Sequence, residues 1–143
     1  MKGGIVLNKK DYLKFLYNYV YIKYADDMRI VFKDDLAEDD FGSYIKERIV
    51  EIPKCTRRDP NEWSLFAFLH EVGHIMTNNL KMKRCEQEYL ATQWAIEESK
   101  EIGFKVPKEY INAYQDYIWT WRERGIKCGA KKIPSREQLT LTF

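Results

Sequence analysis

The chain has 143 residues, a length that suits one domain and leaves little room for a second. Hydrophobic residues make up 45% of it and charged residues 32%, which is typical of a folded globular protein and excludes an intrinsically disordered one. The net charge of +2 does not indicate a nucleic-acid or membrane partner, and no apolar run of about 18 residues is present to span a bilayer.

Two features of the chain predict a cytoplasmic protein. Its first residues lack the long apolar run of a signal peptide. The three cysteines, Cys55, Cys85 and Cys128, are odd in number, widely spaced and without a Cys-x-x-Cys pair. We therefore expect no disulfide framework, and a reducing compartment.

The first half of the chain predicts one helix followed by three short strands. Asn8 is placed as a helix N-cap with the acidic Asp11 at the third position, and apolar residues then recur at helical spacing to about Tyr24. Runs rich in branched and aromatic side chains predict strands over residues 28–32, 43–45 and 48–52. Pro53 closes the last of these strands.

The second half predicts three helices. The run Asp59-Pro60-Asn61-Glu62 places a capping residue, a first-turn proline and a capping-box glutamate in order, so a helix is expected from Pro60 to about Asn79. Further helices are predicted over residues 85–102 and from Pro107 to Gly125. No element is assigned to the tail from about residue 127. A helix, a small three-stranded sheet and three helices make a single α+β domain over residues 1–143.

Residues 70–74 read His-Glu-Val-Gly-His, and these two histidines are the only ones in the sequence. Residues four apart share one face of a helix, so His70 and His74 can bind the same Zn²⁺. Glu71 lies about 100° around the helix and can reach a water on the metal without binding the metal. In such sites zinc lowers the pKa of water toward about 7 and the glutamate takes its proton. The motif therefore predicts one Zn²⁺ per chain and Glu71 as the catalytic base of a metallopeptidase.

A catalytic zinc site needs a third protein ligand, and no histidine remains to supply it. Cys85 fits better as a buried structural thiol than as a ligand. In the helix after the motif, Glu86 and Glu97 project away from the apolar face and are expected in solvent. Glu88 borders that face and Glu98 lies within it, so periodicity alone does not choose between them.

Gly73, inside the motif helix, is unfavourable there unless something needs its missing side chain. Close approach by a strand, by a substrate or by a neighbouring helix would each explain it.

The run LFAFLHEVGH, with Glu88 three residues before Ala91-Thr92-Gln93-Trp94-Ala95 on a later helix, resembles the ImmA/IrrE family of metallopeptidases. Members of that family carry HExGH on an aromatic-rich helix and a glutamate three residues before an Ala-Asn-x-Phe-Ala type segment. The resemblance covers roughly residues 8–100. It implies a zincin-like fold with Glu88 as the third zinc ligand, and a protein substrate such as a repressor or regulator of a mobile element.

These features together predict a zinc endopeptidase that hydrolyses a peptide bond in a protein or peptide substrate. A second electrophile normally stabilises the oxyanion, and Tyr89 and Arg84 are candidates close to the motif in sequence. The alternative is a non-catalytic zinc-binding interaction protein that keeps a zincin-like scaffold. An intact Glu71 argues against this alternative, because a purely structural site needs no base.

Overall fold

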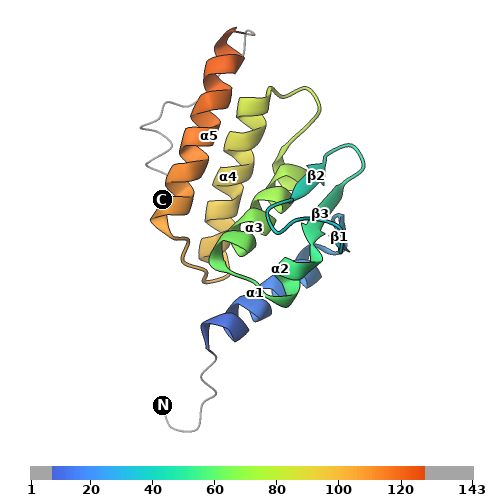
Figure 1. Cartoon of the computed structure of the whole chain (residues 1–143). Helices are drawn as coiled ribbons and strands as arrows, with labels where there is room; N and C mark the ends of the chain where they lie inside the picture. The colour runs from blue at the N-terminus through green and yellow to red at the C-terminus, as the bar shows by residue number, and fades with distance from the viewer. Residues whose placement is uncertain (1–7, 128–143) are drawn as a thin grey trace.

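The structure, a computed structural model, describes residues 8–127, with side chains described as far as residue 120. Its architecture is α+β, as predicted: an N-terminal helix, a three-stranded mixed sheet and then the helices α3–α5 (Figure 1). Cys128 and the tail beyond residue 127 lie outside the described residues. None of the described helices is both long and apolar enough to cross a membrane.

The N-terminal helix and the sheet form where the sequence predicted them, within one or two residues. Helix α1 (Lys9–Tyr24) begins with the expected cap, because the Asn8 side chain accepts a hydrogen bond from the Asp11 amide at 2.8 Å. The strands are β1 (Arg29–Lys33), β2 (Gly42–Tyr44) and β3 (Ile49–Pro53). They lie in the order β1-β3-β2, with β3 parallel to β1 and antiparallel to β2.

Helix α3 (Glu62–Thr77) begins later than predicted and with a different cap. The Asn61 side chain accepts a hydrogen bond from the Ser64 amide at 2.8 Å, and the Ser64 hydroxyl accepts one from the Asn61 amide at 2.9 Å. Ser64 thus takes the capping-box role expected of Glu62, and Asn61 replaces Asp59 as the N-cap. Asn61 is the N-cap because its backbone is extended, which directs its side chain toward the first free amides of the helix.

Asp59 instead follows a short helix, α2 (Lys54–Arg58), that the sequence did not predict. Five residues are too few to show a helical period. Thr56 holds this turn in place, because its hydroxyl donates to the Pro53 carbonyl at 2.7 Å and is bonded by the buried Tyr17 hydroxyl at 2.9 Å. The turn is therefore fixed by a contact with α1 that local sequence cannot reveal.

Helix α3 is the centre of the molecule, with every residue from Ser64 to Ile75 buried. It contacts α1 and the sheet on one side and α4 on the other (Figure 1). Phe68, for example, packs on Tyr17 and Phe32 with ring centroids 5.1 and 6.3 Å away. A helix buried all round places both histidines of the motif inside the protein.

Helices α4 (Arg84–Glu101) and α5 (Lys108–Lys127) complete the fold, with α4 between α3 and α5. A Cβ on Gly73 would lie 2.6 Å from the Ala91 carbonyl oxygen, so the close approach expected at this glycine is made by α4. Helix α5 continues two residues beyond Gly125, its predicted end. A glycine costs a helix only about 1 kcal/mol and does not end it unaided.

Candidate metal centre

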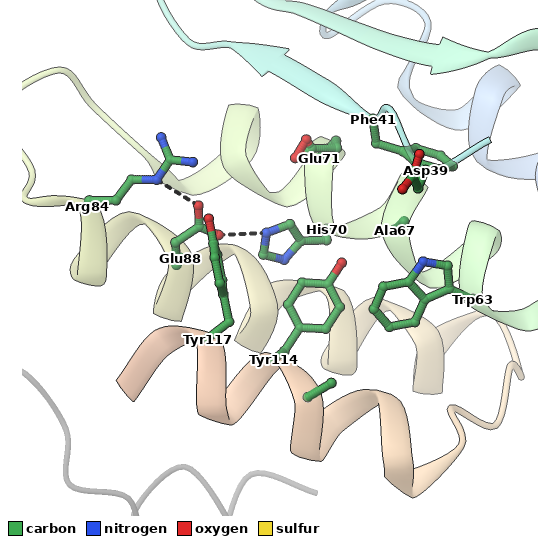
Figure 2. A pocket seen from close by; sticks show the side chains of 11 residues that line it. Asp39, Phe41, Trp63, Ala67, His70, Glu71, Arg84, Glu88, Tyr114 and Tyr117 are labelled. Carbon is green, nitrogen blue, oxygen red and sulfur yellow. Dashed lines mark hydrogen bonds and ion pairs between the residues drawn. The ribbon is translucent and has the colours of Figure 1, made fainter. Parts of the chain in front are cut away.

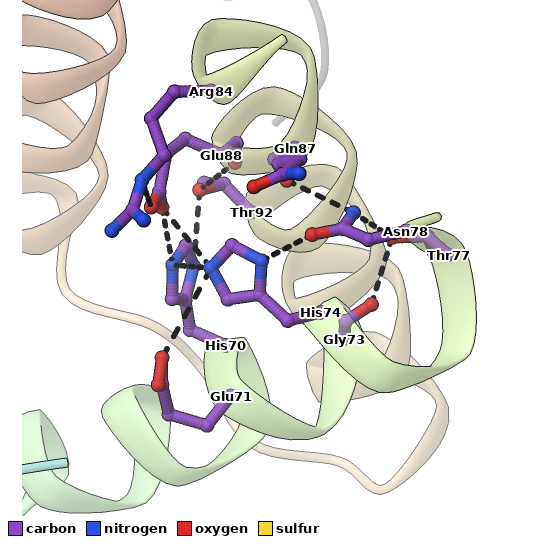
Figure 3. A network of polar contacts seen from close by, with 10 residues as sticks. All are labelled: His70, Glu71, Gly73, His74, Thr77, Asn78, Arg84, Gln87, Glu88 and Thr92. Atoms are coloured by element: carbon purple, nitrogen blue, oxygen red, sulfur yellow. Dashed lines mark hydrogen bonds and ion pairs between the residues drawn. The ribbon is translucent and has the colours of Figure 1, made fainter. Parts of the chain in front are cut away.

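Two side chains of α3 and one of α4 converge at the interface between these helices (Figure 3). The Nε2 atoms of His70 and His74 lie 3.1 Å apart. Glu88 Oε2 lies 2.8 Å from the first and 3.2 Å from the second. All three residues are buried, with Glu88 only 2% exposed. The contact of Gly73 with Ala91 brings the two helices close enough for these atoms to meet.

The proton of the His70 ring is fixed by Thr92, one turn after Glu88 on α4. The Thr92 hydroxyl donates its only hydrogen to the Glu88 carbonyl at 2.8 Å. It must therefore accept at its 3.2 Å contact with His70 Nδ1. The ring hydrogen then sits on Nδ1, and the lone pair of Nε2 faces Glu88 and His74.

His74 is oriented in the same way by Asn78, the C-cap residue of α3. The Asn78 amide nitrogen donates to the Gln87 carbonyl at 3.2 Å, a group that can only accept, so its oxygen Oδ1 must face His74 Nδ1. His74 Nδ1 donates to this oxygen, and Nε2 again presents a lone pair to the centre. Hydrogen bonding of the rear ring nitrogen to a protein acceptor is typical of metal-ligating histidines.

The three converging atoms are close enough together for a single metal ion to contact all of them. Each separation is far below twice a zinc–ligand distance, and ligand atoms around a tetrahedral zinc ion are about 3.3 Å apart. Lone pairs at 2.8–3.2 Å repel unless a cation lies between them. The ligand atoms of His70, Glu71 and His74 also lie within 4.8 Å of one another. The buried group could therefore hold a metal ion.

The protein's own charges keep Glu88 ionised. Burial alone would raise the pKa of Glu88, but the adjoining imidazole groups of His70 and His74 outweigh this effect and hold that pKa well below its usual range. Burial lowers the pKa of His74, but Glu88 raises it more, and the net shift is upward. The centre therefore favours positive charge beside the carboxylate.

Arg84 and Tyr89, the two candidates for a second electrophile, lie on different sides of α4. Arg84 Nε donates to Glu88 Oε1 at 2.9 Å, which leaves Oε2 for the histidines. Arg84 also lines a cavity of about 380 Å³ next to the centre. Tyr89 lines a small separate cavity with Ile111 and Ile118, between α4 and α5, and does not face the centre.

Two other acidic candidates, Glu98 and Glu97, have partners other than the histidines. Glu98 Oε1 accepts a hydrogen bond from Lys23 Nζ of α1 at 2.6 Å, so this buried glutamate is part of an ion pair. Glu97 is exposed and accepts a hydrogen bond from Gln93. Cys85 is buried and is not among the residues that line the cavity.

Glu71 lies beside the three converging atoms, at the wall of an open cavity of about 380 Å³ (Figure 2). Its Oε1 atom is 4.0 Å from His74 Nε2, so it is near the centre without being part of the tight triangle. His70, Glu88 and Arg84 line the same cavity. A molecule in this cavity would therefore meet the candidate ligands and the Glu71 carboxylate together.

Tyr114 of α5 is a further residue of the centre, which the sequence did not identify. Its ring packs on His70, Phe66 and Trp63, with centroids 4.6, 5.2 and 5.5 Å away. Its hydroxyl points into the cavity and has no hydrogen-bond partner among the described residues (Figure 2). Burial, then the charges of Glu71 and Glu88, raise its pKa, so the hydroxyl stays a hydrogen-bond donor. Helical spacing was its only signal in the sequence.

No protein-family model, curated protein or solved structure matches the chain. The buried group of His70, Glu71 and His74 on α3 is therefore the observation on which a functional proposal has to rest.

Proposed function

We propose that this protein is a zinc-dependent peptidase that cuts a peptide bond in a protein or peptide substrate. His70, His74 and Glu88 would hold one Zn²⁺ per chain, and Glu71 would act as the base. The observation that carries the proposal is the convergence of two imidazole nitrogens and one carboxylate oxygen beside Glu71, at the wall of an open cavity. Two histidines and a glutamate form a donor set of catalytic zinc sites in peptidases.

The choice of zinc rests on the donor atoms. Imidazole nitrogens favour zinc and neighbouring transition metals, whereas magnesium and calcium prefer sites made of oxygen atoms. Arg84 occupies the second oxygen of Glu88, which favours binding of an ion through one carboxylate oxygen. Three protein ligands next to an open cavity also fit a catalytic site better than a closed structural one.

When bound, zinc supplies a Lewis acid that polarises the scissile carbonyl and makes water more acidic. Glu71 accepts a proton from the attacking water as the new C–O bond forms. It then passes that proton to the amine nitrogen as the C–N bond breaks, so a single carboxylate serves as base and acid. Its place at the cavity wall, 4.0 Å from His74 Nε2, suits this role.

Tyr114 is the group we assign to the developing negative charge on the carbonyl oxygen. Its hydroxyl, which has no hydrogen-bond partner within residues 8–120, points into the cavity, and three aromatic contacts hold its ring in place. A fixed donor of this kind stabilises an oxyanion without reorganising. Arg84 is assigned instead to positioning Glu88, since its Nε–H donates to the carboxylate oxygen Oε1.

The resemblance to the ImmA/IrrE family extends the proposal to the fold and the substrate. The HExGH helix and the Glu88 helix that carry it are the two helices that meet at the centre. On this basis we assign a zincin-like fold to the chain. Its substrate would be a regulatory protein, such as a repressor of a mobile element, and its compartment the cytoplasm.

The experiment combines metal analysis with hydrolysis of casein, a substrate open to most peptidases. The wild type should bind one zinc per chain and cleave casein. Glu71→Gln should keep the zinc and lose at least about 100-fold in rate, because an amide cannot accept the proton. Glu97→Gln, an exposed change on α4, is the control and should keep both the zinc and the rate of cleavage.

Loss of zinc from Glu71→Gln would show that Glu71 is a ligand and that the mechanism is wrong. A wild type that binds zinc and cleaves nothing would favour the alternative, a non-catalytic zinc-binding interaction protein.

A further inference from the structure

A second cavity, of about 450 Å³, adjoins the one at the metal centre, and Asp39 and Trp63 line both. Asp39 belongs to the loop of residues 34–41 between β1 and β2, and Trp63 to the first turn of α3. Each cavity falls in the size range of pockets that hold drug-sized ligands. Two adjoining cavities provide room for a chain segment that runs from the centre past Asp39 and Trp63.

The two ends of the first cavity differ in charge. Figure 2 shows Arg84 at one end beside Glu88, and Asp39 with Trp63 at the other end. Arg84 is paired with Glu88. Asp39 is exposed and has neither an ion pair nor a hydrogen bond within residues 8–120. A substrate at the Asp39 end therefore meets an unneutralised carboxylate.

The second cavity adds to this negative charge. Glu38, which also lines it, is exposed and unpaired within the same range. Asp59 and Arg58 line it too, and Asp59 is paired with Lys10 at 2.8 Å. With that ion pair neutral, Glu38 and Asp39 outnumber Arg58, so the lining keeps a net negative charge.

Trp63 provides an aromatic surface beside these carboxylates. Its ring is held by Tyr114, stacked at 5.5 Å, and by Tyr110, edge-on at 5.1 Å. An indole face next to a carboxylate suits a lysine or arginine side chain, because the alkyl stem packs on the ring while the charge meets the acid. An acidic side chain would meet repulsion at the same place.

We infer that Asp39 and Trp63 form a specificity subsite for a lysine or arginine residue of the substrate, close to the bond that is cut. This inference rests on the proposed peptidase function, since that function defines what enters the cavity. The substrate is accordingly a peptide segment with a basic residue at one fixed position, and Glu38 strengthens the preference.

The test uses a random peptide library displayed on phage and selected on the full-length, zinc-loaded Glu71→Gln protein, which binds without cutting. Selected peptides should be enriched in lysine or arginine at one position. Asp39→Asn should lower that enrichment by about 5-fold, the upper range for an exposed ion pair. Asp39→Lys should replace it with a preference for acidic residues. Asp35→Asn is the control, because Asp35 is exposed in the same loop and lines neither cavity.

The inference is overturned if no basic preference is selected, or if the preference is unchanged in both Asp39 variants. The selected peptides are then given to the zinc-loaded wild type. If a preference that depends on Asp39 is present and the peptides are not cut, the subsite stands and the peptidase function fails. If the peptides are cut but show no preference that depends on Asp39, the peptidase function stands and the subsite fails.

Discussion

Helix α4 carries two buried glutamates that contact different kinds of partner. Glu88, near its start, faces the Nε2 atoms of His70 and His74. Glu98, near its end, accepts from the ammonium group of Lys23. Both are at most 9% exposed, so burial does not distinguish them. The partners do, because Glu98 is paired with an ammonium group, whereas Glu88, besides its ion pair with Arg84, faces two imidazole nitrogens whose hydrogens are used elsewhere. The groups around a buried carboxylate, and not its burial, therefore indicate whether it is a candidate metal ligand.

The largest expected effect is that of Glu88→Gln on zinc binding. The change keeps the size of the side chain but removes the charge and the anionic oxygen at the centre. Zinc affinity should fall by more than about 100-fold, beyond the usual range for residues that only orient a ligand. Competition with a chromophoric chelator measures it. Glu98→Gln is the matched control on the same helix, and a loss of zinc there instead would reverse the assignment of the two glutamates.

Thr92→Val tests whether the orientation of His70 matters. Valine keeps the shape of the side chain but removes the oxygen that accepts from His70 Nδ1 at 3.2 Å. Zinc affinity should fall by about 10-fold or more. The same chelator assay applies. Ser99→Ala is the control, because this hydroxyl also bonds a carbonyl of α4, at 2.7 Å, but lies next to Glu98. Equal losses in both variants would mean that α4 has merely been weakened.

Gly73→Ala tests the approach of the two helices that brings Glu88 to the histidines. The added Cβ would lie 2.6 Å from the Ala91 carbonyl oxygen, and backbone cannot move aside as a flexible side chain can. The free energy of unfolding in urea should fall by about 1–3 kcal/mol, and zinc affinity should fall with it. Gly42→Ala should be nearly neutral, since nothing lies within 4 Å of its Cβ position. If the stability and the zinc affinity of Gly73→Ala equal those of the wild type, Gly73 is not needed for the close packing of α3 on α4.

The smallest effect is expected at the Glu98 end, and it depends on pH. The hydrogen bond to Glu98 raises the pKa of Lys23, against a smaller opposing contribution from burial. The charged pair therefore stabilises the fold fully below the ordinary lysine pKa, and this contribution is lost as pH rises through the folded-state pKa. Lys23 is partly exposed, so Glu98→Gln should cost at most about 1 kcal/mol at neutral pH.

Urea unfolding of the wild type and Glu98→Gln at neutral pH and at about pH 11 measures this difference. The gap between the two proteins should narrow at the higher pH. A gap that widens would mean that another group next to Glu98 sets the pH dependence.

All elements except α2 could be predicted in order, because each of them has a local signal. The N-terminal helix was predicted from the Asn8 cap, and the three strands from short runs of branched and aromatic residues. The start of α3 was predicted from the cap region before the motif. All these bounds agree with the structure to within two residues. Helix α2 was not predicted, because its turn is fixed in part by a contact with Tyr17 of α1. The cap of α3 was misplaced because Asp59 and Asn61 are both good capping residues, and only the backbone conformation selects one.

The sequence by itself determined that His70 and His74 share a helix face with Glu71 beside them, because four-residue spacing on a helix has one geometric outcome. Periodicity left the position of Glu88 open against Glu98, and the resemblance favoured Glu88. Only the tertiary structure shows that Glu88 meets the histidines while Glu98 meets Lys23. It alone brings Tyr114, Asp39 and Trp63 to one cavity. These residues come from α5, a loop and α3, and contacts between distant segments depend on packing that no local pattern records.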